Sequence, residues 1–121
     1  MSKPRHVLVV DDVPDMRSLL KTTLHQFDIH NVAEASCGEK AIEHYFQEGY
    51  DMVFLDINLP DLSGLEVLKR ILERNSRAHV VMVSGESSVD NVKTALSSGA
   101  KGFIVKPYSP SKIKGALDRY K

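Results

Sequence analysis

The chain has 121 residues, of which 42% are hydrophobic and 26% are charged, which is the composition of one ordinary soluble domain. Sixteen basic residues balance sixteen acidic ones, so no overall field attracts nucleic acid or an anionic membrane. The single cysteine, Cys37, excludes an internal disulfide, and no apolar run approaches the roughly 20 residues that span a bilayer, so we expect a cytoplasmic protein.

Short apolar runs alternate with helical patterns along the chain. Four runs are compact and rich in β-branched residues, as expected of strands that are covered on both faces. They are VLVV (7–10), MVFL (52–55), VVMV (80–83) and FIV (103–105). A fifth run, NVAEA (31–35), is more polar and is typical of an edge strand.

The five intervening segments carry apolar residues at helical spacing. These positions are Met16, Leu19, Leu20, Leu24 and Phe27; Ala41, Ile42, Tyr45 and Phe46; Val67, Leu68, Ile71 and Leu72; Val89, Val92, Ala95 and Leu96; and Ile113, Ala116, Leu117 and Tyr120. Ser36 with Glu39 and Ser63 with Glu66 have the spacing of capping boxes, which predicts that the second and third helices begin there.

Five alternating strand–helix units in so short a chain predict an α/β fold with a doubly wound parallel sheet. Right-handed crossovers place helices on both faces of such a sheet. Ligands then bind beyond the carboxyl ends of the strands, where the winding reverses. The residues that follow each strand are therefore the candidates for a functional site.

Four of the five strands deliver a polar or charged residue to this edge. Asp11 and Asp12 follow the first strand, Asp56 the third, Ser84 the fourth and Lys106 the fifth. Three nearby carboxylates repel one another, and a single lysine cannot neutralise three. Magnesium, which prefers a few oxygen ligands, would relieve this repulsion. A carboxylate can also accept a phosphoryl group, so the residues predict metal-dependent phosphoryl transfer.

Four segments carry a family resemblance over the whole chain. They are VLVVDD (7–12), FLDINLPDLSG (54–64), VMVSG (81–85) and GFIVKP (102–107), in order and at the right spacing. With these segments the chain resembles a response-regulator receiver domain of the CheY-like family. The resemblance implies one receiver domain over residues 1–121, with a flavodoxin-like sheet of order 2-1-3-4-5 and five helices.

The resemblance also implies roles for the residues at the strand ends. Asp56 would be the phosphoacceptor, and Asp12, Asp56 and the backbone carbonyl of Asn58 would bind Mg²⁺, with Mn²⁺ as an alternative ion. Asp11 would help to position the metal, mostly through water. Lys106 would contact the phosphoryl group.

Other positions match the switch and tuning residues of the family. Ser84 would be the hydroxyl switch and Phe103 the aromatic switch, and the Lys106–Pro107 peptide bond would be cis. Asn58 and Glu86 would tune how quickly the acyl phosphate hydrolyses.

The expected function is a phosphorylation-activated switch of a two-component system. A histidine kinase or histidine phosphotransfer protein would supply the phosphoryl group, and the domain would catalyse only its own phosphorylation and dephosphorylation. The face formed by the fourth helix, fifth strand and fifth helix would control a partner or an attached output domain. We expect any phosphorylation-dependent homodimer to form there, and no direct binding to nucleic acid or membrane.

Two other functions suit a similar fold. A flavin carrier needs a phosphate cradle after the first strand, where DDVPD would repel phosphate. An aspartate-based phosphohydrolase, the stronger alternative, needs room for a substrate-selecting cap that the five units do not leave.

Simpler roles stay open for Ser84 as a helix cap and Phe103 as a core residue. The acidic residues expected to be solvated loop or cap residues are Asp15, Asp28, Asp51 and Asp61.

Overall fold

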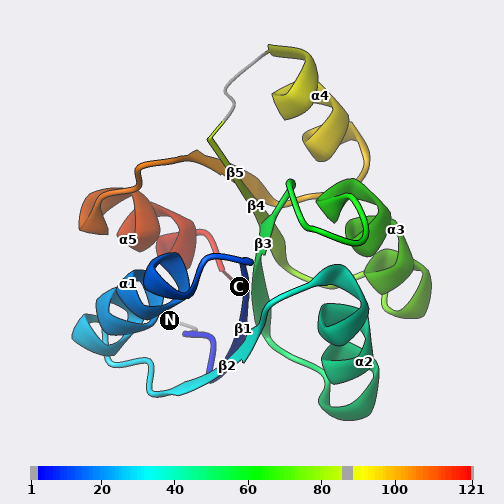
Figure 1. Ribbon diagram of the computed structural model, residues 1–121. Coiled ribbons are helices and arrows are strands. Elements are labelled where there is room, and N and C mark those ends of the chain that lie inside the picture. Colours follow the sequence, from blue (N-terminus) through cyan, green and yellow to red (C-terminus); the bar gives the residue numbers. More distant parts are fainter. Residues whose placement is uncertain (1–2, 86–88, 121) are drawn as a thin grey trace.

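The computed structural model describes residues 3–85 and 89–120, in which strands and helices alternate along the chain (Figure 1). The strands are β1 (His6–Val10), β2 (Asn31–Ala35), β3 (Met52–Asp56), β4 (Val80–Ser84) and β5 (Gly102–Val105). The helices are α1 (Pro14–Gln26), α2 (Gly38–Glu48), α3 (Gly64–Arg74), α4 (Val89–Ser97) and α5 (Pro110–Asp118). All strand pairs are parallel and the order is β2-β1-β3-β4-β5, so the predicted α/β fold and strand order are confirmed.

The helices form a layer on each face of the sheet. Figure 1 shows α1 and α5 on one face and α2, α3 and α4 on the other. Successive strand residues therefore pack into different cores: Val9 and Phe54 lie in the core with α1 and α5, while Leu8 and Leu55 lie in the core with α2, α3 and α4. Coverage of both faces explains why β1, β3 and β4 are continuous apolar runs. None of the helices within residues 3–85 and 89–120 combines the length and apolar character of a membrane span.

Neither predicted capping box forms as a reciprocal Ser–Glu pair within the described residues, although Ser63 is a cap and the Glu66 side chain pairs with Arg70 instead. Ser63 does cap α3, because its side chain accepts a hydrogen bond from the Leu65 N–H. Helix α2, in contrast, begins after Cys37, whose side chain makes no capping hydrogen bond. The first N–H groups of α2 donate instead to Asp61, which lies in the loop between β3 and α3. A tertiary contact has thus replaced the local Ser36–Glu39 cap.

Candidate functional site

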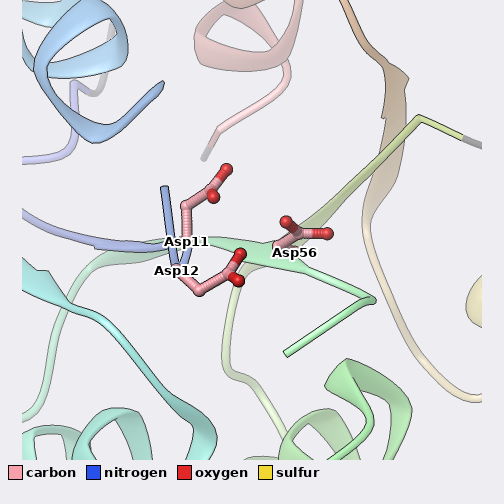
Figure 2. Close-up of side chains that lie close together, drawn as sticks. All are labelled: Asp11, Asp12 and Asp56. Carbon is pink, nitrogen blue, oxygen red and sulfur yellow. The ribbon is translucent and has the colours of Figure 1, made fainter. Parts of the chain in front are cut away.

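The parallel strands bring most of the predicted site residues to one edge of the sheet. Asp11 directly follows β1, Asp56 ends β3, Ser84 ends β4, and Lys106 directly follows β5. Because parallel strands have their carboxyl ends at the same edge, these positions lie at the predicted location for a site. Figure 2 shows the side chains of Asp11, Asp12 and Asp56 gathered where β1 and β3 end.

Three carboxylates form a compact cluster at this edge. Asp11, Asp12 and Asp56 each offer one carboxylate oxygen, and these oxygens all lie within 4.8 Å of one another. Asp11 and Asp56 are buried, whereas Asp12 is exposed. Closely spaced carboxylates repel one another unless a cation lies between them, and oxygen ligands of this kind suit a hard divalent ion. The donor set therefore fits Mg²⁺.

Lys106 supplies one positive charge to the cluster. Its Nζ donates to Asp11 Oδ2 at 2.7 Å and to Asp56 Oδ2 at 2.9 Å. Burial alone would lower the pKa of Lys106, but the hydrogen bonds to Asp11 and Asp56, with their charges, raise this pKa above its usual 10.5. The lysine is therefore protonated at neutral pH and its ammonium is directed at the two buried carboxylates.

The Asp56 carboxylate is held at both oxygens. Its Oδ1 accepts a hydrogen bond from the Asn58 N–H at 3.0 Å, and its Oδ2 accepts the bond from Lys106. Burial raises the pKa of Asp56 above its ordinary 3.8, although the bonds from Lys106 and Asn58 lower it in part. Asp56 is thus a desolvated carboxylate with a fixed orientation and a cation beside it, which are the properties of an oxygen nucleophile.

The other two carboxylates differ in how much of their bonding capacity is used. Asp11 Oδ1 accepts from the Val13 N–H at 2.9 Å while its Oδ2 accepts from Lys106. For Asp12, no hydrogen bond or ion pair to its carboxylate occurs in residues 3–85 and 89–120. The exposed Asp12 is therefore the carboxylate most available to a metal ion, and Asp11 is already committed to protein donors.

Asn58 lies in a short loop that returns directly to α3. The loop is closed by an antiparallel bridge between Asn58 and Ser63, and by a hydrogen bond of 2.7 Å from the Gly64 N–H to the Ile57 carbonyl. A Cβ on Gly64 would overlap the backbone oxygen of Asp56 and lie 2.7 Å from the Ile57 Cα. Only glycine allows α3 to begin this close to the end of β3. Among the described residues, no donor occupies the Asn58 carbonyl oxygen, which leaves it free to bind a cation.

The two predicted switch residues lie on neighbouring strands, Ser84 at the end of β4 and Phe103 in β5. Ser84 is fully buried, and its carbonyl accepts a hydrogen bond of 2.8 Å from the Lys106 N–H. Phe103 is half-buried and packs against the core shared with α2, α3 and α4. The Lys106–Pro107 peptide bond is cis, the geometry that the resemblance implies. Glu86 lies outside the described residues.

Two hydrogen bonds near the start of α1 were not predicted from the sequence. Arg17 Nη1 donates to the Asp11 carbonyl at 2.7 Å, and its Nε donates to Glu34 at 3.1 Å. The Tyr108 hydroxyl donates to the Met16 carbonyl at 3.0 Å. Burial raises the pKa of Tyr108 to about 12, and the negative charge of Asp11 is a smaller cause in the same direction. An arginine in the first turn of the helix that follows Asp11 could have indicated the first contact. Tyr108 lies 97 residues beyond Asp11 in the sequence, so no local pattern indicates the second.

Comparisons of the sequence with a family model and with known proteins all point to the same family. The model of the response regulator receiver domain matches residues 7–118. Chemotaxis protein CheY of Listeria monocytogenes is 37% identical over 113 residues, which cover 93% of this chain and 95% of that protein. Transcriptional regulatory protein TrcR of Mycobacterium tuberculosis is 36% identical over 120 residues, which cover 96% of this chain but 46% of TrcR.

Solved structures with the same fold include proteins with an ion and a phosphoryl mimic. A chain of the CheX-CheY-BeF3-Mg²⁺ complex from Borrelia burgdorferi matches with a TM-score of 0.90 and 32% identity, over 95% of this chain and 87% of that one. Response regulator protein TrrA from Thermotoga maritima, in complex with Mg²⁺-BeF, matches with a TM-score of 0.87 and 30% identity, over 97% and 99% of the two chains. The chain therefore belongs to the response regulator receiver domains and is a CheY-like domain of two-component signalling.

Proposed function

We propose that this chain is a phosphorylation-activated switch in which Asp56 accepts the phosphoryl group. One observation carries the proposal: Lys106 contacts the buried Asp56 inside a cluster of three carboxylates at the carboxyl ends of the strands. The phosphoryl donor is a histidine kinase or a histidine phosphotransfer protein. As a receiver domain the chain is a phosphoacceptor in signalling and not a conventional enzyme; we propose in addition that it catalyses its own phosphorylation and dephosphorylation.

The transfer step needs an unprotonated Asp56 oxygen. This oxygen attacks the phosphorus of phosphohistidine, so a P–O bond forms while the P–N bond breaks and the imidazole leaves. Lys106 donates hydrogen bonds to the phosphoryl oxygens as they approach Asp56. In the return step a water molecule attacks the phosphorus, releases inorganic phosphate and restores the carboxylate. Asn58 and Glu86 tune the rate of this hydrolysis.

The metal site consists of residues that already surround Asp56. Asp12, Asp56 and the backbone carbonyl of Asn58 would hold Mg²⁺ directly, and Asp11 would help to position it, mostly through water, with Mn²⁺ as an alternative ion. When bound, the ion offsets negative charge on the phosphoryl oxygens. The exposed Asp12 and the free carbonyl of Asn58 support this assignment.

The output surface in this proposal is the face formed by α4, β5 and α5, with Ser84 and Phe103 as the connection to Asp56. A groove of about 330 Å³ lies between β5 and α5 on this side of the molecule. Its charged lining residues Lys101, Lys112 and Arg119 form no ion pair with any residue that the structure describes. Unpaired cations beside a groove favour binding of a partner protein or a second copy there. We propose that the protein acts in the cytoplasm.

Intact mass after incubation with acetyl phosphate and Mg²⁺ tests the proposal. We expect the wild type to gain one phosphoryl group and Asp56→Asn to gain none, because the nearly isosteric amide is not a nucleophile. Asp118→Asn, which changes an exposed carboxylate on α5, is the matched control and should gain the same adduct as the wild type. Steady consumption of acetyl phosphate without an adduct would instead support the aspartate-based phosphohydrolase.

A further inference from the structure

Asp61 joins the loop between β3 and α3 to the start of α2. Its Oδ1 accepts a hydrogen bond of 2.8 Å from the Gly38 N–H, and its Oδ2 accepts one of 2.9 Å from the Glu39 N–H. These two N–H groups belong to the first residues of α2 and have no partner inside the helix. A carboxylate from a different part of the chain therefore caps this helix through both of its oxygens.

The packing around Gly38 makes this contact close and specific. A Cβ on Gly38 would lie 2.9 Å from Val67 Cγ2, 3.0 Å from Leu62 Cβ and 3.3 Å from Asp61 Oδ1. The start of α2 thus fits against the loop and α3 with no room for a side chain. The pKa of the Asp61 carboxyl is lowered because the Glu39 and Gly38 N–H groups donate to its ionised form, so the contact is intact at neutral pH.

The loop that Asp61 holds is the one that carries Asn58. Asn58 and Ser63 face each other across the loop in an antiparallel bridge, and Asp61 lies between them at the turn. A second restraint on Asn58 is its N–H bond to Asp56 Oδ1. Phosphorylation would occupy one of the two Asp56 oxygens, which now accept from Asn58 and Lys106. The Asp61 contacts to Gly38 and Glu39 do not involve Asp56.

We propose that Asp61 is a positioning residue that fixes the Asn58 carbonyl for metal binding by locking the loop to α2. This inference rests on the proposed function, because it concerns the metal that assists phosphorylation of Asp56. Mg²⁺ demands near-ideal octahedral geometry at short distances, so a ligand on a loose loop binds it poorly. Groups that orient a metal ligand without touching the metal have large effects on affinity.

The first experiment measures Mg²⁺ affinity by calorimetric titration and the phosphorylation rate with acetyl phosphate, on the full chain. Asp61→Ala should weaken Mg²⁺ binding by about tenfold, the lower end of the usual effect of such orienting groups. At subsaturating Mg²⁺ it should slow phosphoryl uptake to a similar extent. Asp61→Asn should recover part of both, because an asparagine oxygen also caps helices. Asp118→Ala removes an exposed carboxylate elsewhere and should match the wild type.

A second variant disturbs the same contact from the side of α2. An alanine Cβ at position 38 would crowd Val67 and Leu62 first and Asp61 Oδ1 next, so Gly38→Ala should push the start of α2 off the loop and should also weaken Mg²⁺ binding. Combined with Asp61→Ala, it should add little, because both changes break one contact; independent effects would multiply. Urea unfolding of each variant separates positioning from stability.

Wild-type Mg²⁺ affinity and phosphorylation rate in Asp61→Ala, with only the free energy of unfolding reduced, would overturn the inference and leave the proposed function standing. Multiplicative effects in the double variant would also overturn it. Absence of an adduct in the wild type would overturn the proposed function and this inference together.

Discussion

The Lys106 ammonium lies 2.9 Å from Asp56 Oδ2, although 50 residues separate the two along the chain. The same ammonium contacts Asp11 at 2.7 Å, and Asp12 brings a third carboxylate within reach of the other two. Within the described residues, Lys106 is the one cation that pairs with these carboxylates, so one positive charge offsets three negative ones. This imbalance determines how the site should respond to metal, pH and mutation.

Magnesium should stabilise the folded protein through this site. At ten times its dissociation constant, an ion that binds only the folded state adds about 1.4 kcal/mol to the free energy of unfolding. For a domain of this size the Tm should rise by about 5 °C. Asp12→Ala should remove most of the response, because it deletes the exposed ligand. Thermal unfolding with and without millimolar Mg²⁺ measures this, and an equal response in wild type and variant would exclude Asp12 as a ligand.

Asp56 should lower stability at neutral pH, because burial raises its folded-state pKa above 3.8. Below pH 3.8 the carboxyl is protonated in both folded and unfolded states and makes no difference. As the pH rises from 3.8 through the folded-state pKa, the unfolded state loses its proton first, so stability falls and then levels off. Asp56→Asn should therefore increase the free energy of unfolding at pH 7 without metal.

Urea unfolding at a series of pH values checks this prediction. The gain from Asp56→Asn should shrink steadily as the pH approaches 3.8. A gain of the same size at every pH would assign the effect to packing or hydrogen bonding and not to ionisation.

Lys106 should matter for the rate of phosphorylation itself. Lys106→Met keeps much of the aliphatic stem but removes the donor to the phosphoryl oxygens. Loss of a charged donor at the reacting group should slow phosphoryl uptake by at least about tenfold at saturating Mg²⁺. Lys114→Met, on an exposed face of α5, is the matched control. A time course of intact mass gives both rates, and equal rates would remove Lys106 from the transfer step.

Phosphorylation of Asp56 should change the conformation of the face formed by α4, β5 and α5. If Ser84 turns to bond the phosphoryl group, space opens beside β5 for the half-buried Phe103 to turn inward. Full burial of a large ring is worth about 1.5 to 3 kcal/mol, enough to bias two packings. Beryllofluoride with Mg²⁺ should therefore shift amide resonances from Ser84 through Lys106.

The serine variant separates chemistry from signalling. Ser84→Ala should still be phosphorylated, but its shifts should stay close to Asp56. Shifts confined to the strand ends in the wild type, with Phe103 and α4 unchanged, would contradict the switch.

The sheet and the cluster at its edge were predictable because their signals are local. Buried parallel strands read as continuous apolar runs, so their ends, and the residues Asp11, Asp56, Ser84 and Lys106, could be located from the sequence. Parallel strands then require these ends to meet. The contact of Lys106 with both buried carboxylates is a direct result of this geometry.

The contacts that support the site were not predictable in the same way. The Ser36–Glu39 pattern satisfies a local capping rule, but Asp61, 23 residues from Gly38, occupies the same N–H groups. Sequence spacing does not show whether a local side chain or a side chain from another loop will bond the first N–H groups of a helix. Arg17 at the Asp11 carbonyl is a similar case, because its position depends on how α1 lies against β1 and on the pairing of Arg17 with Glu34 of β2.

The close approach of α3 to β3 has a consequence for anyone who transplants this site or screens it genetically. Gly64 has no functional group, yet any side chain there would collide with the backbone of the residue that we propose as phosphoacceptor. Random mutagenesis scored by loss of signalling should return Gly64 as readily as the acidic residues. A designer who grafts the three aspartates and the lysine onto another parallel sheet must also copy this glycine, or the acceptor will not keep its orientation.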